Sequence, residues 1–330
     1  MSAHRRTRLS ITLAALLAAG LASSLAARAQ TYPSKPIHIV VPYAPGGITD
    51  VIARALGQRL SEAWKQQVVI ENKPTGAGIV GTDAVAKAAP DGHTLLVAAD
   101  AAFVTAPHTY SKLPYDPITD FVPVTGLGIS PQALIVHPSV PVRTLADLID
   151  LGKRKPGELN YGTFGVGTSG HLNIVLMEGM TGAKFTPVHY RGATPALTDT
   201  IAGHIQMMIV SIGLVAQPWQ AGHLKVLGFG SSTRLAQFPD VPTLAESGLP
   251  GYEAGSWYGL VAPKGTPRAI VDKLNAEARR IFDDLQFRER VLAPSFIYSI
   301  VSSPEDFAER IRTDSAKWGK VIREANIKAE

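Results

Sequence analysis

Two short glycine-rich junctions contain the residue types best suited to holding an anion. The first, Pro45-Gly46-Gly47, follows a strand-like run from Ile37 to Tyr43 and precedes a helix predicted to begin near Thr49. Glycine lets the backbone approach a ligand closely, and the first turn of a helix offers unpaired N–H groups at the positive end of its dipole. A carboxylate or phosphate would be stabilised there. A tight turn without any ligand also explains a lone Gly-Gly pair.

The second junction, Gly165-Val166-Gly167-Thr168-Ser169-Gly170, also lies between a predicted strand and a predicted helix. It spells G-x-G-x-x-G, the outline of a dinucleotide fingerprint. The next strand, however, ends at His189-Tyr190-Arg191 without the acidic residue that would hold a ribose, so we do not predict a nucleotide site. The same glycines, with the hydroxyls of Thr168 and Ser169 at a helix start, suit a carboxylate equally well.

Other catalytic or metal-binding patterns are weak. The chain has nine histidines but no H-E-x-x-H motif or short-spaced cluster, and it has no cysteine, so neither a metal nor another cofactor is predicted. Ser169 does not lie in a G-x-S-x-G elbow, which leaves a hydrolase open but unsupported. Arg191 could form a bidentate pair with a ligand carboxylate, or it could be a solvated charge at the rim of a site.

The first 29 residues have the pattern of an export signal. Arg5, Arg6 and Arg8 precede an uncharged run, and Ala27-Arg28-Ala29 supplies small residues for cleavage near Ala29. An uncleaved membrane anchor is the alternative, because the run is nearly long enough to span a bilayer. This segment contains four of the 32 basic residues and no acid, so the mature chain is close to neutral and is not expected to bind nucleic acid. No second apolar span follows, which predicts a soluble mature protein in the periplasm.

Short apolar runs alternate with helix-like segments, which is typical of an α/β fold with mostly parallel strands. The helix after Gly47 would place Ile52, Leu56 and Leu60 on one face. A capping box is expected at Thr144-Leu145-Ala146-Asp147, and Thr266 and Ser303 are expected to cap C-terminal helices that begin at Pro267 and Pro304. Further strands are predicted at 68–70, 94–97, 133–136, 159–162, 186–190 and 207–210, and further helices at 169–180 and 193–202.

A series of motifs carries a resemblance to a known family. Tyr32-Pro33-Ser34-Lys35-Pro36 and Ala44-Pro45-Gly46-Gly47-Ile48-Thr49-Asp50 resemble the start of the mature solute-binding proteins of tripartite tricarboxylate transporters, the Bug family. The resemblance continues in order along nearly the whole mature chain. Its further motifs are Asn72-Lys73-Pro74-Thr75-Gly76-Ala77-Gly78, Asp91-Gly92-His93-Thr94-Leu95-Leu96, Leu113-Pro114-Tyr115-Asp116-Pro117, Tyr161-Gly162, Gly165-Val166-Gly167-Thr168, His171-Leu172, Tyr190-Arg191-Gly192, Pro195-Ala196-Leu197, Asp240-Val241-Pro242-Thr243, Ser256-Trp257-Tyr258-Gly259-Leu260 and Lys317-Trp318-Gly319-Lys320-Val321-Ile322.

The resemblance implies a periplasmic-binding-protein-like, Venus-flytrap α/β fold. Residues 1–29 would be the signal peptide, 30–130 with 254–330 a discontinuous first domain, and 131–253 a second domain joined to it by a hinge. The ligand would lie in the cleft between the domains, where the two glycine-rich loops would grip one acid from opposite sides. The predicted ligand-binding residues are Tyr43, Pro45, Gly46, Gly47, Thr49, Asp50, Phe103, Phe164, Gly165, Gly167, Thr168, Ser169, Tyr190, Arg191 and Val210.

Three of these residues depart from what the family commonly has, and each departure removes polarity. Phe103 replaces a frequent His, Phe164 a small residue, and Val210 an Asp. Valine cannot accept hydrogen bonds from a ligand, whereas two phenyl rings could stack on an aromatic acid. We therefore expect a weakly hydroxylated or aromatic carboxylate rather than citrate or an amino acid. The alternative is that these apolar side chains only pack in a core.

The predicted function is that of a monomeric solute-binding protein, not an enzyme. It would capture a small organic carboxylate, close by hinge motion, and deliver it to the integral membrane components of the transporter. Trp257 and Tyr258 would line the cleft or fill a core. Two alternatives stay open at this point: a ligand-sensing subunit that feeds a sensor kinase, and an exported hydrolase.

Overall fold

The computed structural model describes residues 32–74, 78–324 and 326–328. The predicted signal peptide, 1–29, and Thr75-Gly76-Ala77 of one motif lie outside these ranges. Residues from Lys35 onward form one compact unit, whose fold is described below. No helix in the described ranges is both long enough and apolar enough to cross a membrane.

The strands form one mixed sheet, in the order β2-β1-β3-β9-β4-β7-β5-β6, with β8 and β10 also paired to β4. One group, β2-β1-β3, is parallel, and a second group, β7-β5-β6, is parallel as well. The strands are β1 Ile37–Val41, β2 Val68–Asn72, β3 Thr94–Ala99, β4 Phe121–Val136, β5 Asn160–Thr163, β6 Thr186–His189, β7 Met207–Ser211, β8 Lys225–Phe229, β9 Gly255–Pro263 and β10 Tyr298–Ser299. The α/β class predicted from the alternating pattern is confirmed.

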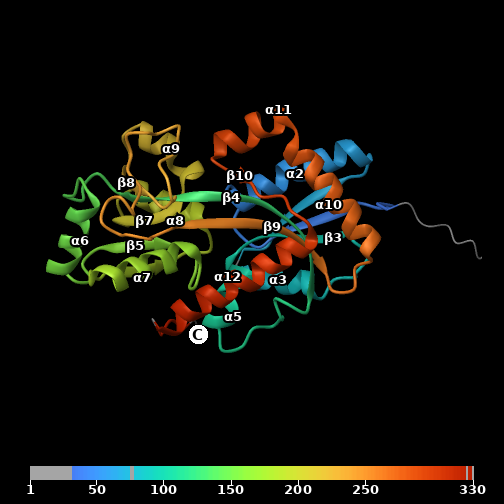
Figure 1. The fold of residues 1–330 in the computed structure, drawn as a ribbon, viewed down its shortest axis with the longest axis horizontal. Coiled ribbons are helices and arrows are strands. Elements are labelled where there is room, and N and C mark those ends of the chain that lie inside the picture. Colours follow the sequence, from blue (N-terminus) through green and yellow to red (C-terminus); the bar gives the residue numbers. More distant parts are fainter. Residues whose placement is uncertain (1–31, 75–77, 325, 329–330) are drawn as a thin grey trace, which may run out of the picture. The chain divides into compact units, whose positions relative to one another are not determined.

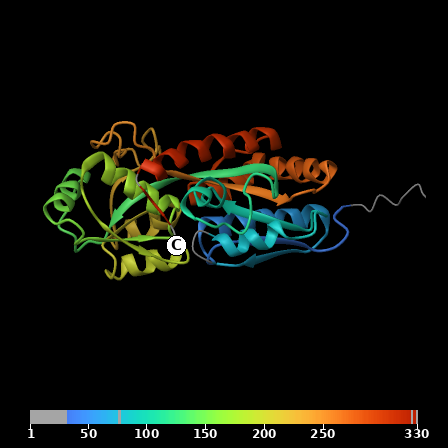
Figure 2. The same cartoon turned by 90° about the horizontal axis from the view of Figure 1, so that it is seen from below.

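Two long antiparallel strands, β4 and β9, join the two parallel groups (Figure 1). The first part of β4 pairs with β9, whereas Gln132 to Val136 pair with β7 and β8. At the same time β9 pairs with β3 through Tyr258 to Val261. Figure 2 shows β4, in green, running from one group of elements to the other. The domain boundaries predicted near residues 130 and 253 lie next to Pro131 and Gly255, which pair with each other. The division of the chain into two domains at these points stays a prediction.

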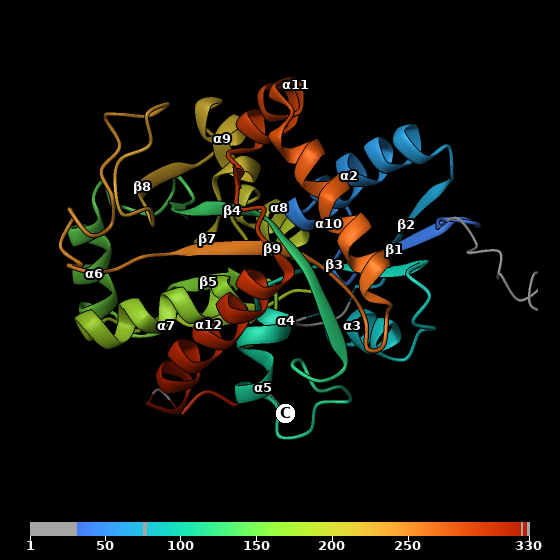
Figure 3. The same cartoon turned by 45° about the vertical axis from the view of Figure 1, so that its right-hand side comes forward.

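The helices are α2 Ile48–Trp64, α3 Ile79–Ala86, α4 Ala101–Val104, α5 Ala106–Thr109, α6 Leu145–Arg154, α7 Ser169–Thr181, α8 Ala193–Ile201, α9 Ile212–Gln220, α10 Arg268–Asp283, α11 Leu285–Phe287 and α12 Pro304–Glu324, with a π-helical turn at Arg288–Leu292 and a 3₁₀ turn at Ala293–Ser295. The six helices that were predicted begin close to the expected positions, and α3, α4, α5, α9 and α11 were not predicted. Ile52, Leu56 and Leu60 of α2 are fully buried, as their spacing predicted. Figure 3 shows α2 and α10 on one side of the strands and α3, α4 and α12 on the other.

The helix caps follow the sequence in two of three cases. The Thr144–Asp147 capping box is present, and Ser303 Oγ accepts a hydrogen bond from the Asp306 N–H over 3.0 Å. The prediction for Thr266 is wrong, because its hydroxyl donates to the carbonyl of Pro263 and α10 begins only at Arg268. Pro267 itself takes the N-cap position, with an extended ψ of 138°, so the helix starts one residue later than predicted.

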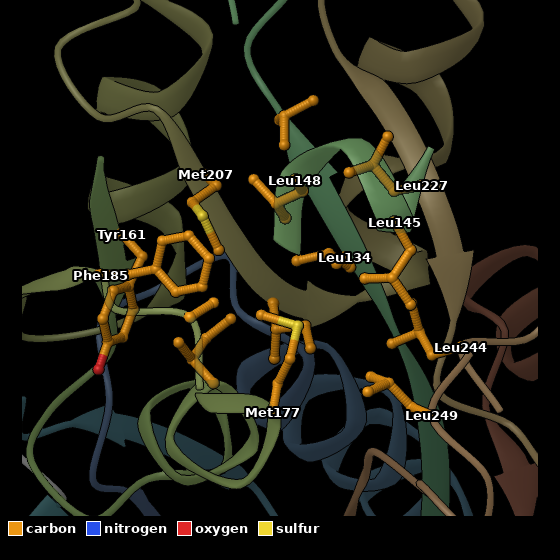
Figure 4. Packing of buried hydrophobic residues seen from close by; sticks show 14 of the residues in the cluster. Leu134, Leu145, Leu148, Tyr161, Met177, Phe185, Met207, Leu227, Leu244 and Leu249 are labelled. Carbon is orange, nitrogen blue, oxygen red and sulfur yellow. The ribbon is translucent and has the colours of Figure 1, made fainter. Parts of the chain in front are cut away.

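A hydrophobic core fixes α6 and α7 against the second group of strands (Figure 4). Leu134 of β4, Met207 of β7 and Tyr161 of β5 pack there with Met177 of α7. These side chains are essentially inaccessible to water, and each stabilises the fold by about 2 kcal/mol through burial. The helix starts at the carboxyl ends of these strands are therefore held in place by the core beneath them.

Candidate functional site

A small cavity of about 40 Å³ lies where the carboxyl ends of β1, β3 and β7 meet the starts of α2, α8 and α9. Such strand ends are where open α/β sheets bind ligands. Its lining consists of Tyr43, Ala44, Gly47, Ile48, Thr49, Ala99, Gln132, Phe164, Ala193, Val210, Ser211, Leu214, Ser256 and Tyr258. Within the described ranges, no residue of this lining carries a charge, so any anion must be held by neutral donors.

The loop before α2 is fixed by a buried carboxylate. One Asp50 oxygen, Oδ2, accepts from the Gly46 N–H over 3.0 Å and from Arg54 Nε over 2.9 Å. The other, Oδ1, accepts from Asn72 Nδ2 over 2.9 Å. Burial opposes ionisation of Asp50, but these hydrogen bonds outweigh it and hold the pKa of the carboxyl below its ordinary value. Asp50 lies outside the described lining of the cavity and fixes the loop that borders it, so its predicted contact with a ligand stays a prediction.

Three helices that border the cavity begin without a side-chain cap. Their N-cap residues are Gly47 for α2, Gly192 for α8 and Ser211 for α9. The first N–H groups of a helix have no intrahelical acceptor, so these starts present donors and partial positive charge. They also lie close together. A Cβ placed on Gly192 would stand 3.0 Å from Ala44 Cβ.

The glycine-rich loop at 165–170 uses several of its donors internally, although α7, which follows it, also begins without a side-chain cap. The Gly165 N–H bonds Thr163 Oγ1 over 3.1 Å, and the Gly167 N–H bonds His171 Nδ1 over 3.1 Å. Thr168 Oγ1 donates to the Gly165 carbonyl over 2.7 Å. Gly165, Gly167, Thr168 and Ser169 are absent from the described lining of the cavity. The helix start that meets the Pro-Gly-Gly loop there is that of α8, whereas the resemblance implied that of α7.

Contacts join the parts of the chain on the two sides of the cavity. Thr105 Oγ1 donates to the Gly167 carbonyl, and Thr194 Oγ1 donates to the Pro45 carbonyl over 3.3 Å. Ser130 and Ser211 also share a hydrogen bond between their hydroxyls. These contacts hold the two sides of the cavity together in this arrangement.

The remaining predicted residues divide between the cavity and other places. Tyr43, Gly47, Thr49, Phe164 and Val210 line the cavity together. Pro45 and Gly46 belong to the same loop but lie outside the lining.

Three predicted residues lie elsewhere. Phe103 is buried in a hydrophobic core, where its ring meets Phe121 edge-to-face at 5.3 Å. Tyr190 donates its hydroxyl to Asp199 Oδ2 over 2.6 Å, and Arg191 is exposed. None of the three contributes to the described lining of the cavity.

Sequence reasoning missed three of the polar side chains in the described lining of the cavity, those of Gln132, Ser211 and Ser256. Gln132 Nε2 donates to Ser169 Oγ over 2.7 Å, and Gln132 Oε1 accepts from Asn173 Nδ2 over 2.8 Å. Among the described residues, Gln132 Nε2 has no second hydrogen-bond acceptor. Ser256 and Tyr258 belong to β9, and of these only Tyr258 was considered. Trp257, between them, faces the other way, since its Nε1 donates to Asp314 Oδ2 over 2.8 Å.

A buried acid lies directly behind the cavity. Asp100 Oδ1 accepts from Ser256 Oγ over 2.8 Å and from the Ala101 N–H over 2.9 Å. Burial, with a smaller contribution from the charge of Asp314, raises the pKa of Asp100 to about 7. Burial and the neighbouring Asp100 raise the pKa of Tyr43 and Tyr258 above the ordinary value, so both phenols remain hydrogen-bond donors. Tyr43 Oη is buried and has no hydrogen-bond partner among the described residues.

Comparisons with known proteins match this sequence and fold. Residues 52–327 match the model of the "Tripartite tricarboxylate transporter family receptor". Protein BugT of Bordetella pertussis is 35% identical over 98% of both chains. Two solved structures are R. palustris Rpa4515 with adipate (34% identity, TM-score 0.87, 90% of this chain and 99% of that one) and MatC from Rhodopseudomonas palustris with bound malate (31%, 0.83, 88% and 100%). The uncharged cavity between helix starts therefore belongs to a member of the tripartite tricarboxylate transporter receptor family, which includes the Bug proteins.

Proposed function

We propose that this chain is a periplasmic solute-binding protein that captures a small organic carboxylate and delivers it to the membrane components of a tripartite transporter. The observation that carries the proposal is the cavity bounded by the uncapped starts of α2, α8 and α9. Helix starts stabilise an anion without any cationic side chain. Family membership and the carboxylates held by the two solved relatives support the same function.

The carboxylate would be held by donors from several elements. The first N–H groups of α2, the free amide N–H of Gln132 and the hydroxyl of Tyr43 all belong to residues of the lining. The cavity has room for only a few water molecules in this closed arrangement, because a single water needs roughly 10–15 Å³. The ligand is therefore compact, or its binding widens the cavity, and waters can bridge the remaining gaps.

The body of the ligand would be apolar. Ile48, Phe164, Val210 and Leu214 form the apolar part of the lining. A citrate would leave hydroxyl and carboxylate groups against these side chains without partners, which is costly. We therefore propose a weakly hydroxylated or aromatic acid, with the Phe164 ring packing against it.

We also propose that residues 1–29 are removed on export and that the mature chain acts as a monomer. Residues 30–130 with 254–330 and residues 131–253 would form two domains that move apart about β4 and β9 to open the cavity. A bound acid would contact both sides and favour closure. The closed form would then be recognised by the membrane components.

We propose that the chain binds its ligand without chemical change. The hydroxyl of Ser169, the candidate nucleophile, accepts a hydrogen bond from Gln132. The nearby His171 accepts at Nδ1 from the Gly167 N–H, and burial lowers its pKa to about 4. The contacts of both side chains are structural ones, and a serine activated by this histidine is not formed.

A thermal-shift screen of residues 30–330 against mono-, di- and tricarboxylates and aromatic acids tests the proposal. A ligand at a hundredfold excess over its dissociation constant stabilises the folded state by roughly 2.7 kcal/mol. We expect one compact acid to raise the melting temperature, and Gly47→Leu to abolish that shift. Gly179→Leu is the matched control, because a Cβ there would meet open space on α7.

Two outcomes would count against the proposals. A panel in which citrate or glutamate gives the largest shift would overturn the apolar ligand class while keeping the binding function. No shift with any acid would overturn carboxylate capture itself. If an acid binds, uptake assays in cells that lack the gene distinguish transport from sensing, since only a transport protein is needed for accumulation of the acid.

A further inference from the structure

The cavity has one acidic group directly behind its wall, and this group has no role in the function described so far. Asp100 ends the loop after β3 and caps α4, and Ser256, which lines the cavity, donates to its Oδ1 over 2.8 Å. Resting on the proposed function, we propose that Asp100 is a specificity-determining residue: it admits an acid with a single carboxylate and rejects a second carboxylate at the Ser256 end of the cavity.

The two ends of the cavity differ in electrostatic character. Gly47, Ile48 and Thr49 bring the start of α2 to one part of the lining, where partial positive charge favours a carboxylate. Ser256, Tyr258 and Ala99 form another part, next to Asp100. In this proposal the carboxylate lies at the start of α2, and the other end of the acid points toward Ser256.

A second carboxylate at that end would approach Asp100 closely. A group that contacts Ser256 Oγ lies about 5 Å from Asp100 Oδ1, since it is separated from it by two hydrogen-bond lengths. Two carboxylates this close cannot both ionise without a large penalty. A hydroxyl or methyl group at the same place meets no such repulsion.

The groups around Asp100 do not neutralise it. Tyr43 and Tyr258 face it from the ends of β1 and β9, and both remain protonated phenols. Asp314 of α12 adds a like charge, although Arg310 Nε lies 3.7 Å from Asp314 Oδ2. Hydrogen bonds from Ser256, Ala101 and the Trp257 backbone stabilise the ionised form, but burial outweighs them. The negative charge of Asp100 is therefore already unfavourable in this buried place, and a second negative charge from a ligand would increase the penalty.

The experiment compares two pairs of acids that differ only at the far end: 4-hydroxybutyrate with succinate, and 6-hydroxyhexanoate with adipate. Dissociation constants are measured by calorimetry on residues 30–330. For wild type we expect the hydroxy acid of each pair to bind at least tenfold more tightly than the diacid near pH 8. In Asp100→Asn this ratio should fall at least tenfold, because Asn keeps the cap of α4 and removes the charge.

The pH dependence gives a readout that a structural role of Asp100 would not produce. In wild type, the ratio of the diacid dissociation constant to the hydroxy-acid dissociation constant should rise between about pH 6 and about pH 8, as Asp100 loses its proton. In Asp100→Asn this ratio should not change with pH. Asp284→Asn is the matched control, since the Asp284 side chain also caps a short helix, α11, but lies away from the cavity. Its ratios should match those of wild type.

Each result decides between the two proposals. Equal ratios in wild type and Asp100→Asn, with measurable binding, would overturn the role of Asp100 and leave carboxylate capture intact. No binding of any acid to either protein would overturn the proposed function itself. If Asp100→Asn fails to fold, Ser256→Ala replaces it. Because the hydrogen bond from Ser256 stabilises the ionised form of Asp100, this variant raises the pKa of Asp100 further. The pH at which the preference for the hydroxy acids appears should therefore move upward, and an unmoved pH profile would overturn the role of Asp100.

Discussion

Asn72 ties Asp50 to the loop before α2, because its Nδ2 donates both to Asp50 Oδ1 over 2.9 Å and to the Tyr43 carbonyl over 3.1 Å. The end of β2 and the start of α2 are thus fixed to each other through the loop that borders the cavity. The geometry of this loop depends on groups that do not line the cavity themselves.

Replacing Asp50 with Ala should therefore reduce both stability and ligand binding. The change leaves three donors without their acceptor, at a cost of about 2–3 kcal/mol in the free energy of unfolding. Urea denaturation measures this cost. Because the folded-state pKa of Asp50 is lowered, its contribution is present above the ordinary value of 3.8 and is lost as the pH falls through the folded-state value.

Asp150 provides the matched control for Asp50. It pairs with Arg154 four residues on, at the same 2.9 Å as Asp50 with Arg54, but its side chain is 64% exposed against 5% for Asp50. Asp150→Ala should cost no more than about 0.5 kcal/mol, since exposed pairs contribute little. Equal costs for the two variants would show that Asp50 does not position the loop.

The two adjacent glycines should respond differently to substitution by alanine. Gly46 has φ +82°, in the left-handed region, so Gly46→Ala should lower the free energy of unfolding by about 1–2 kcal/mol. Gly47 has φ −75°, which alanine accepts, and its new methyl group would lie beside the cavity. Gly47→Ala should thus keep the melting temperature of the empty protein and weaken ligand binding. A comparison of unliganded melting temperatures with calorimetric affinities checks both, and a reversed pattern would contradict the assignment.

Alanine substitutions of the two phenylalanines predicted to touch the ligand should have different effects on stability and on binding. Phe103 is 1% exposed in a core with Phe121 and Trp257, so Phe103→Ala should cost about 3–5 kcal/mol of stability. Phe164 is only partly buried and lines the cavity. Phe164→Ala should cost less stability and weaken the binding of an apolar acid at least tenfold. Affinity unchanged in Phe164→Ala would show that its ring does not contact the ligand.

Asp100 should make stability fall as the pH rises. Its pKa is about 7 in the folded protein and 3.8 ordinarily, so between these values the folded state holds a proton that the unfolded state has lost. Stability therefore decreases by about 4 kcal/mol between about pH 4 and about pH 7 and is level above that window. Asp100→Asn should remove this decrease. Urea unfolding at several pH values measures it, and parallel profiles for both proteins would contradict it.

Local signals in the sequence were sufficient for much of the fold. Thr144 and Ser303 indicate helix starts, because their side chains accept hydrogen bonds from nearby backbone N–H groups. The Gly46-Gly47 turn indicates the point where a strand ends and a helix begins. The strand β4 was predicted only from Ala133, yet it begins at Phe121. Pro123, Gly126 and Gly128 interrupt its pattern, and the register shifts at these residues accommodate them through pairing with a distant strand.

The candidate site was only partly predictable, because part of it also depends on pairing between strands that are distant in the sequence. Gly47 and Thr49 follow a local motif, whereas Ser256 and Asp100 meet only because β9 pairs with β3. No spacing in the sequence encodes that pairing. The loop at 165–170 was a convincing motif, but the N–H groups of Gly165 and Gly167 bond Thr163 and His171, and the loop's glycines are absent from the described lining of the cavity.

The position of β9 between β3 and β4 has a consequence for folding kinetics. Leu96 pairs with Val261, far along the chain, so the first group of strands lacks a neighbour until residue 263 has been made. Such non-local pairing slows folding, because the entropy of closing a long loop is lost before the contacts form. A nascent chain that cannot complete its sheet stays unfolded for longer. That delay would suit a protein that must be threaded across a membrane before it folds.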